Sequence, residues 1–229
     1  MRVASHGVLD SLEGMAQRIL NESAGRFAIA GHSMGGRVAL EVFRTAPERV
    51  SGIALMDTGV GALPAGDEGL REAEGRAALL AKARAEGMRA MAREWVQGMV
   101  HPGRLRDARL IEPILDMFEA KSPDIYAAQI RALLNRPDAS EVLGTIRCPA
   151  LVLCGHEDAW APVQRHRDMA AAIGRCAFAD IPNCGHMSTM ERPQAVNEAM
   201  LSWLRTVGAA EKARSPRGGA GPRLGGACS

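Results

Sequence analysis

The sequence has no apolar run that approaches the roughly 18 residues needed for a membrane-spanning helix. It also lacks, at its N-terminus, the basic stretch and apolar segment of a secretory signal. Both absences favour a cytoplasmic protein without a membrane partner. With 229 residues, of which 47% are apolar and 24% charged, the chain is long enough for one folded domain with a sizeable core.

An excess of charge of one sign is missing from most of the chain. The formal net charge is +2, but from Ala209 onward four cationic residues accompany one acidic residue, which leaves residues 1–208 at −1. A nearly neutral body argues against a nucleic-acid-binding surface. Residues 209–229 form a basic, glycine-rich tail, a composition typical of disordered chain ends.

Cysteines are few and odd in number, which indicates reduced thiols rather than disulfides. The five are Cys148, Cys154, Cys176, Cys184 and Cys228. The triplet Cys-Gly-His occurs at both 154–156 and 184–186, but Cys-x-His is not a usual spacing of structural zinc ligands. We therefore expect neither a metal nor a cofactor.

Four short apolar runs have the composition of buried strands. They cover residues 26–30, 50–56, 150–154 and 176–181. Apolar residues recur at helical spacing after the first run and again over 196–207. Near-continuous apolar strands that alternate with helices predict an α/β domain over residues 1–208, with a parallel sheet flanked by helices.

Residues 63–147 interrupt this alternation, because they contain three helical stripes and no strand pattern. This segment is interpreted as a helical lid inserted between two strands. Its first stripe consists of Met88, Met91, Trp95 and Met99. Such a stripe either lines an apolar pocket for a substrate or belongs to the core, and the sequence leaves both open.

The segment Gly31-x-Ser33-x-Gly35 follows one strand and opens a helix, which is the context of a nucleophile elbow. We expect the flanking glycines to be required because a Cβ in so sharp a turn would clash. The helix N-terminus favours negative charge nearby, and the Met34 backbone N–H is a candidate donor to an oxyanion. Ser33 is therefore the predicted nucleophile.

A serine hydroxyl needs a base, and His186 lies just past the last strand, at the same sheet edge as Ser33. His32 is interpreted as a packing residue that points away from the reacting side. Asp158, after the third strand, is the predicted acid, since the order serine, aspartate, histidine is that of an elbow-type hydrolase. Its rivals are Glu157, one residue away, and Asp57 at the end of the preceding strand.

Together these motifs resemble the α/β-hydrolase superfamily, and within it the small bacterial esterase-like members. The motifs are GHSMGG (31–36), RTAPER (44–49) with ALMDT (54–58), CPALVL (148–153) with G-x-x-D (155–158) and Pro162, and CGH (184–186) with ERP (191–193). The resemblance implies a serine hydrolase acting on a small-molecule carboxylic ester, thioester or lactone. A sibling chemistry with the same triad (C–C hydrolase or perhydrolase) and a catalytically impaired remnant that binds a ligand or partner stay open.

The resemblance also implies that the chain starts late in the fold. Family members begin with further strands, and an early loop supplies a second oxyanion donor. Val3-Ala-Ser-His-Gly7, together with Asp10-Ser11, instead resembles the segment after the fourth strand of family members. We therefore expect an N-terminally truncated fold in which strand 26–30 is an edge with one neighbour, and a chain that is poorly soluble and nearly inactive.

Overall fold

The computed structural model describes residues 1–214, and its centre is a four-stranded sheet. The strands are β1 (Phe27–His32), β2 (Val50–Met56), β3 (Ala150–Gly155) and β4 (Cys176–Ile181). All pair in parallel in the order β1-β2-β3-β4, with Ala30 opposite Ala54 and Leu55 opposite Val152. The four expected strands and the parallel α/β fold are confirmed.

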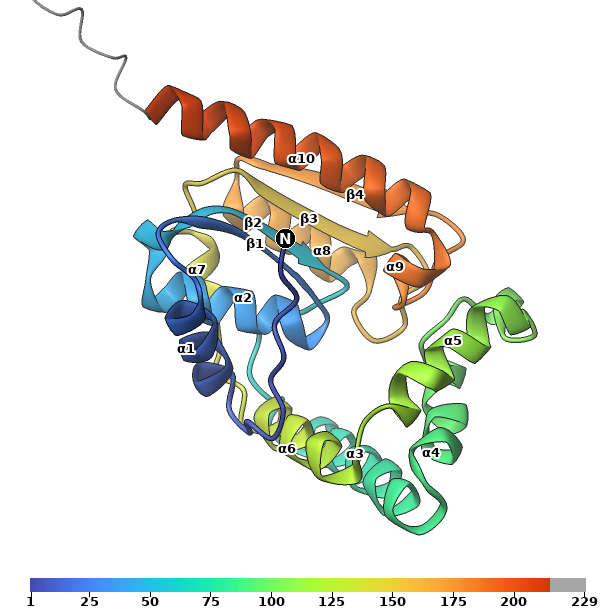
Figure 1. Ribbon diagram of the computed structural model, residues 1–229. Coiled ribbons are helices and arrows are strands. Elements are labelled where there is room, and N and C mark those ends of the chain that lie inside the picture. The colour runs from blue at the N-terminus through green and yellow to red at the C-terminus, as the bar shows by residue number, and fades with distance from the viewer. Residues whose placement is uncertain (215–229) are drawn as a thin grey trace, which may run out of the picture.

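Helices cover both faces of this sheet (Figure 1). On one side lie α1 (Leu12–Glu22), α2 (Met34–Thr45) and α8 (Val163–Ile173), and on the other lies α10 (Pro193–Arg214). Successive side chains of a strand point to opposite faces, so β2 sends Ile53 and Leu55 into the core under α2 and α8, and Ala54 and Met56 into the core under α10. This two-sided burial explains why β2 and β3, which are buried along their whole length, consist of near-continuous apolar runs.

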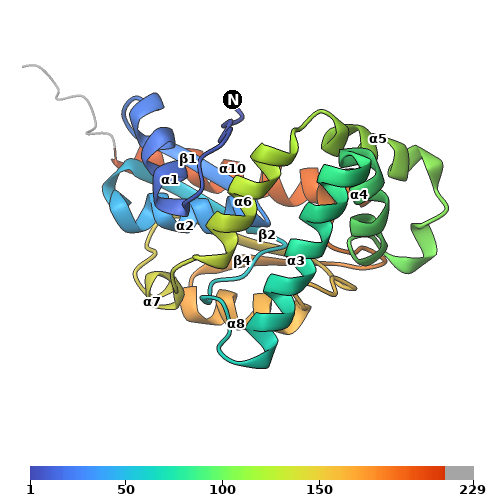
Figure 2. The same cartoon turned by 90° about the horizontal axis from the view of Figure 1, so that it is seen from below.

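The segment between β2 and β3 is helical, and Figure 2 shows its longer helices lying across the sheet. It contains α3 (Asp67–Glu86), α4 (Met88–Trp95), α5 (Ala108–Glu119), α6 (Pro123–Leu134) and the short α7 (Ser140–Leu143). A cluster that includes Met99, Ile114 and Met187 packs this segment against the loop after β4. The helices therefore stand over the carboxyl ends of the strands.

The C-terminal helix α10 runs to Arg214, so residues 209–214 are helical rather than part of an irregular tail. Val207 is buried against the sheet, and the helix continues beyond this last anchor through Gly208 to Arg214, with no proline to end it. The remaining tail, with Cys228, lies outside the described residues. Among residues 1–214, no helix is both long and apolar enough to span a bilayer.

Candidate active site

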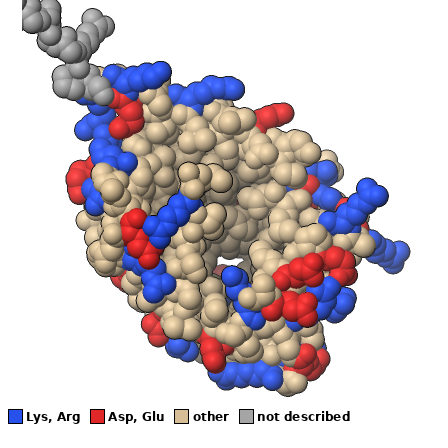
Figure 3. All heavy atoms as spheres, in the orientation of Figure 1, with Lys and Arg blue, Asp and Glu red and all other residues tan. Residues whose placement is uncertain are grey.

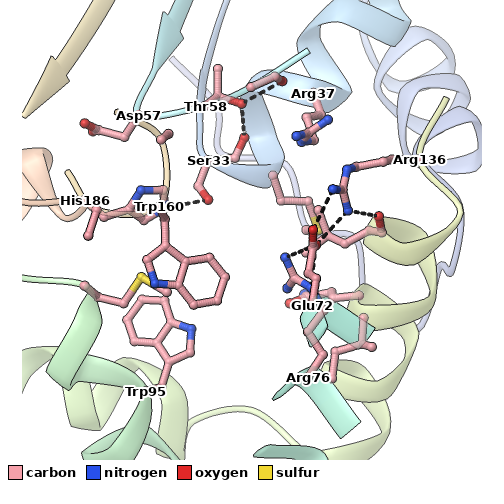
Figure 4. Close-up of a pocket in the computed structure, with 18 of the residues that line it drawn as sticks. Ser33, Arg37, Asp57, Thr58, Glu72, Arg76, Trp95, Arg136, Trp160 and His186 are labelled. Carbon is pink, nitrogen blue, oxygen red and sulfur yellow. Dashed lines mark hydrogen bonds and ion pairs between the residues drawn. The ribbon is translucent and has the colours of Figure 1, made fainter. Parts of the chain in front are cut away.

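Ser33 occupies the turn that joins β1 to α2, with φ 52° and ψ −118°. A non-glycine residue rarely adopts a positive φ, and it persists only where surrounding contacts hold it. Here the Ser33 N–H donates to the Met56 carbonyl at 2.8 Å, and the Thr58 hydroxyl donates to the Ser33 carbonyl at 2.7 Å. The end of β2 thus holds the serine in the elbow conformation (Figure 4).

The elbow needs two glycines, although not the two that flank the serine. A Cβ on Gly31 would lie 2.0 Å from the Gly35 carbonyl oxygen, and one on Gly36 would lie 2.7 Å from Thr58 Cγ2. A Cβ on Gly35 would meet no atom within 4 Å. The expectation of a clash is therefore correct for Gly31 and wrong for Gly35, because the crowding comes from the neighbouring helix turn and from β2.

Asp158, His186 and Ser33 form one continuous hydrogen-bonded chain. His186 Nε2 lies 2.8 Å from Ser33 Oγ, and His186 Nδ1 lies 2.8 Å from Asp158 Oδ2. Because a carboxylate only accepts, Nδ1 carries the proton and Nε2 is free to accept from the serine hydroxyl. The imidazole and the carboxylate are both buried, at 5% and 3% exposure.

The Asp158 carboxylate is held by its own loop as well. Its Oδ1 accepts the N–H groups of Trp160 and Ala161, each at 2.9 Å. Burial opposes ionisation of Asp158, but the hydrogen bond from His186 and these two N–H groups outweigh it and lower the pKa of the carboxyl. The acid therefore stays ionised beside the imidazole.

The two rival acids have other partners. Asp57, which is fully buried, accepts from the Gly155 N–H at 2.8 Å and from the Ser188 hydroxyl. Glu157 accepts from the Cys184 N–H at 2.9 Å. Neither makes a hydrogen bond or ion pair with His186 within residues 1–214, so the geometry favours Asp158.

His32 does not line the cavity beside Ser33, but it is more than a packing residue, because its side chain makes polar contacts behind the triad. Its Nε2 donates to the His186 carbonyl at 2.7 Å and lies 3.3 Å from Asp57 Oδ2, and the two imidazole rings are 5.4 Å apart. Burial lowers the pKa of His32, but the Asp57 carboxylate and the His186 carbonyl raise it by more, so the net pKa is raised. His32 thus tethers the loop that carries His186.

His166 belongs to the framework of the site and lies in helix α8. It is fully buried in α8, accepts the Thr58 N–H at 2.9 Å through Nε2, and lies 3.3 Å from the Pro162 carbonyl through Nδ1. The spacing of His166, Met169 and Ile173 along one helix face was the signal in the sequence that could have revealed this inward position.

A cavity of about 380 Å³ opens beside this triad. Ser33, Met34 and His186 lie in its wall with Trp95 and Met99, whereas Met88 and Met91 pack in a separate core cluster. The stripe predicted from the sequence therefore divides, because only Trp95, at the end of α4, and Met99, after it, reach the cavity. The Trp95 and Phe118 rings pack 4.6 Å apart and form an aromatic part of the wall.

Met34 is the first residue of α2, so its N–H has no acceptor within that helix. It borders the cavity beside Ser33. A donor in this position, at the positive end of the helix dipole, suits a negatively charged oxygen attached to Ser33. The geometry fits the oxyanion role expected from the sequence.

Charged residues that the sequence reasoning missed also line the cavity, and Figure 4 shows Arg37, Glu72, Arg76 and Arg136 across it from His186. They are Arg37, Glu72, Arg76, Arg136 and Arg165. The five come from α2, α3, the loop after α6, and α8, and no local pattern marks them as neighbours. Figure 3 shows the hollow on this face of the molecule with cationic side chains beside it.

The buried cysteines show no sign of a metal centre. Burial raises the pKa of the Cys154 thiol to about 12, so it stays protonated at neutral pH. His156 pairs with Asp180 at 2.8 Å, and His186 is engaged by the triad. Within residues 1–214, no group of three or more His, Cys, Asp and Glu side chains is arranged to hold a metal ion.

Comparison with known proteins places this geometry in a family. The profile of the Alpha/beta hydrolase family matches residues 3–199. The chain belongs to the alpha/beta hydrolase family. An esterase from Thermogutta terrifontis has a similar structure, with a TM-score of 0.76 and 29% identity over 90% of this chain and 75% of that one. The enol-lactonase of Burkholderia xenovorans LB400 shares the fold, with a TM-score of 0.72, 24% identity, and coverage of 88% of this chain and 75% of that one.

Curated relatives within this family are longer. The chain is 30% identical over 210 residues to a Pseudomonas putida protein named dihydrolipoyllysine-residue acetyltransferase component of acetoin cleaving system, matching 89% of this chain and 52% of that protein. It is 27% identical to a 2-hydroxy-6-oxononadienedioate/2-hydroxy-6-oxononatrienedioate hydrolase of the same species, matching 77% of this chain and 62% of that protein. The chain thus spans about half to three-fifths of the length of these two relatives.

Proposed function

We propose that this chain is a serine hydrolase that cleaves a small carboxylic ester, thioester or lactone through an acyl-enzyme. The observation that carries the proposal is the unbroken hydrogen-bonded chain from Asp158 through His186 to Ser33 in the wall of a cavity. A named esterase among the similar structures, at 29% identity, supports the same class of reaction.

In the proposed reaction, Ser33 Oγ attacks the carbonyl carbon while its proton passes to His186 Nε2. Asp158 stabilises the imidazolium, and the Met34 N–H donates to the oxyanion. His186 then gives its proton to the leaving alcohol or thiol. In the second half, water adds to the acyl group, its proton passes through His186 to Ser33, and the free acid leaves.

A second candidate function is hydrolysis of an oxo-dienoate. The observation that favours it is a group of relatives named as hydrolases of such compounds, at 25–28% identity. The same three side chains serve both candidates. The two candidates are separated by measuring whether the chain turns over short esters or an oxo-dienoate faster.

The test of the proposed function is covalent labelling with a fluorophosphonate. We expect the probe to modify Ser33, since its activated hydroxyl attacks electrophilic phosphorus as it attacks a carbonyl. Ser33→Ala is expected to abolish labelling and to lower ester turnover by at least about a thousandfold. Peptide mapping identifies the modified residue.

Ser140→Ala provides the matched control, because Ser140 begins the short helix α7 and does not line the cavity. Its labelling is expected to equal that of the unaltered protein. Labelling that persists undiminished in Ser33→Ala would remove Ser33 as nucleophile. A protein that binds ligands in the cavity without labelling or turnover would point to the catalytically impaired remnant.

A further inference from the structure

The cavity wall that faces Ser33 carries an excess of positive charge. Four arginines, Arg37, Arg76, Arg136 and Arg165, line the cavity together with one glutamate, Glu72. The other carboxylate at its edge, Asp57, is occupied by the Gly155 N–H and the Ser188 hydroxyl. The sign of the charge is therefore set by the arginines.

Two of the four arginines share one carboxylate within the protein, that of Glu72. Arg136, whose side chain is only 6% exposed, holds Glu72 through two hydrogen bonds of 2.7 and 2.8 Å. Arg76 pairs with the same carboxylate at 2.8 Å and lies over the Trp160 ring. This cluster is a structural ion network that fixes α3 to the residues after α6.

The other two arginines, Arg37 and Arg165, have no carboxylate partner. Within residues 1–214 neither forms an ion pair, and the Arg37 guanidinium donates only to the Gly61 carbonyl, at 2.8 Å. Burial and the neighbouring guanidinium of Arg136 lower the pKa of Arg37 to about 10. Holding a desolvated cation among other cations is unfavourable unless an anion joins it.

Gly59 leaves space between these two guanidinium groups. A Cβ on Gly59 would lie 3.0 Å from Arg37 Nη2 and 3.4 Å from Arg165 Nη1. Arg37 Nη2 and Arg165 Nη1 therefore both lie near one point on the cavity wall, the position of that Cβ. Guanidinium groups recognise carboxylates by paired, charge-assisted hydrogen bonds, and two converging groups make such a site.

This site lies close to the nucleophile. Ser33 precedes the first residue of α2, and Arg37 follows it by four residues, about one helical turn or roughly 6 Å along the axis. The geometry points to a substrate whose acyl part carries a second, free carboxylate, held by Arg37 and Arg165 while the ester or lactone carbonyl meets Ser33. This inference rests on the proposed hydrolase function and names its substrate class.

The experiment compares two esters of equal length, monoethyl glutarate and ethyl valerate, by pH-stat. We expect a higher kcat/KM for monoethyl glutarate in the unaltered protein. Arg37→Met is expected to lower that kcat/KM by about ten- to a hundredfold more than it lowers the kcat/KM of ethyl valerate, because only the charged ester loses its partner. Arg93→Met, at an exposed position on α4, removes the same charge away from the cavity and is expected to change neither value.

A second variant is needed because Arg37 also donates to the Gly61 carbonyl, so Arg37→Met could disturb the fold as well as the site. Gly59→Ala keeps both arginines and fills the space between them, and we expect the same selective loss for monoethyl glutarate. Binding is measured separately with glutarate, as a rise in unfolding temperature of Ser33→Ala, which has no nucleophile. That rise is expected to disappear when Arg37→Met is added.

The outcomes separate the two proposals. Binding of glutarate to Ser33→Ala without any ester turnover in the unaltered protein would support the carboxylate site and overturn the hydrolase. Equal kcat/KM for the two esters, or no effect of Arg37→Met and Gly59→Ala on their ratio, would overturn the carboxylate site alone. Stabilisation of Ser33→Ala by inorganic phosphate but not by glutarate would also overturn it.

Discussion

Asp57 and Asp158 end neighbouring strands, are equally inaccessible to solvent, and have different partners. Asp158 gives one oxygen to His186 and the other to two backbone N–H groups. Asp57 gives one oxygen to the Gly155 N–H and the other to the Ser188 hydroxyl, and His32 lies beside it. Asp158 is placed to orient the base, whereas Asp57 joins the end of β2 to the last residue of β3 and to Ser188 after β4.

Replacing each acid by its amide separates these roles. Asp158→Asn keeps an oxygen for the two N–H groups but presents an NH₂ to His186, so we expect turnover to fall by about four orders of magnitude through the wrong tautomer. Asp57→Asn leaves one buried donor without an acceptor and is expected to cost about 1–3 kcal/mol of unfolding free energy. Ester kinetics and urea unfolding measure the two effects. Equal losses of activity and stability in both variants would contradict this division.

His166 gives the site a dependence on pH that is separate from catalysis. Its burial lowers its pKa, and its Nε2 must stay unprotonated to accept the Thr58 N–H. In the unfolded chain the imidazole takes a proton near its ordinary pKa of about 6.5, so acid favours the unfolded state. Stability from this residue is therefore present above that pH and is lost as the pH falls below it.

The measurement is urea unfolding at pH 7.5 and 5.5. We expect the unaltered protein to lose about 1 kcal/mol more than His166→Gln between these values, because the amide can accept the Thr58 N–H without titrating. All other side chains are the same in both proteins, so the comparison isolates His166. Parallel losses in the two proteins would rule His166 out as the titrating group.

At the scale of elements, β1 differs from β2 and β3 because it lies at an edge of the sheet. Within residues 1–214 it pairs with β2 alone, as the sequence predicted for strand 26–30. Phe27 and Ile29 are half-buried, whereas Ala28 and Ala30 face solvent. One side of this strand presents unpaired backbone groups without a proline or a mid-strand charge to discourage edge-to-edge association.

We expect Ala28→Lys to increase the monomeric fraction of this chain, since a lysine on an exposed edge strand opposes pairing with a second edge. Ala77→Lys, at an exposed position of α3, adds the same charge elsewhere and serves as the control. Size-exclusion chromatography at equal concentration measures both. A gain of equal size in the two variants would attribute the effect to net charge rather than to the edge.

At the scale of the whole molecule, the sequence predicted what depends on local periodicity and on strand ends. The four strands, their parallel arrangement and the meeting of Ser33, Asp158 and His186 at one sheet edge all follow from such patterns. It did not predict α3 as an element, because only Gly69 and Ala83 are buried along its 20 residues. Nor did it predict the cationic wall, since Arg37, Arg136 and Arg165 become neighbours only through packing between distant segments.

The hydrogen bond between Thr58 and His166 matters for any attempt to transfer this site to another protein. The Thr58 hydroxyl holds the Ser33 carbonyl, the Thr58 N–H holds His166, and His166 lies against the Pro162 carbonyl at the end of the loop that carries Asp158. The nucleophile and the acid, which are far apart in the chain, are thus connected through Thr58 and through His166, which does not line the cavity. A graft that copied only Ser33, Asp158 and His186 into a new scaffold would carry the reacting atoms. It would lack Thr58 and His166, whose hydrogen bonds fix the position of the Ser33 turn relative to the Asp158 loop.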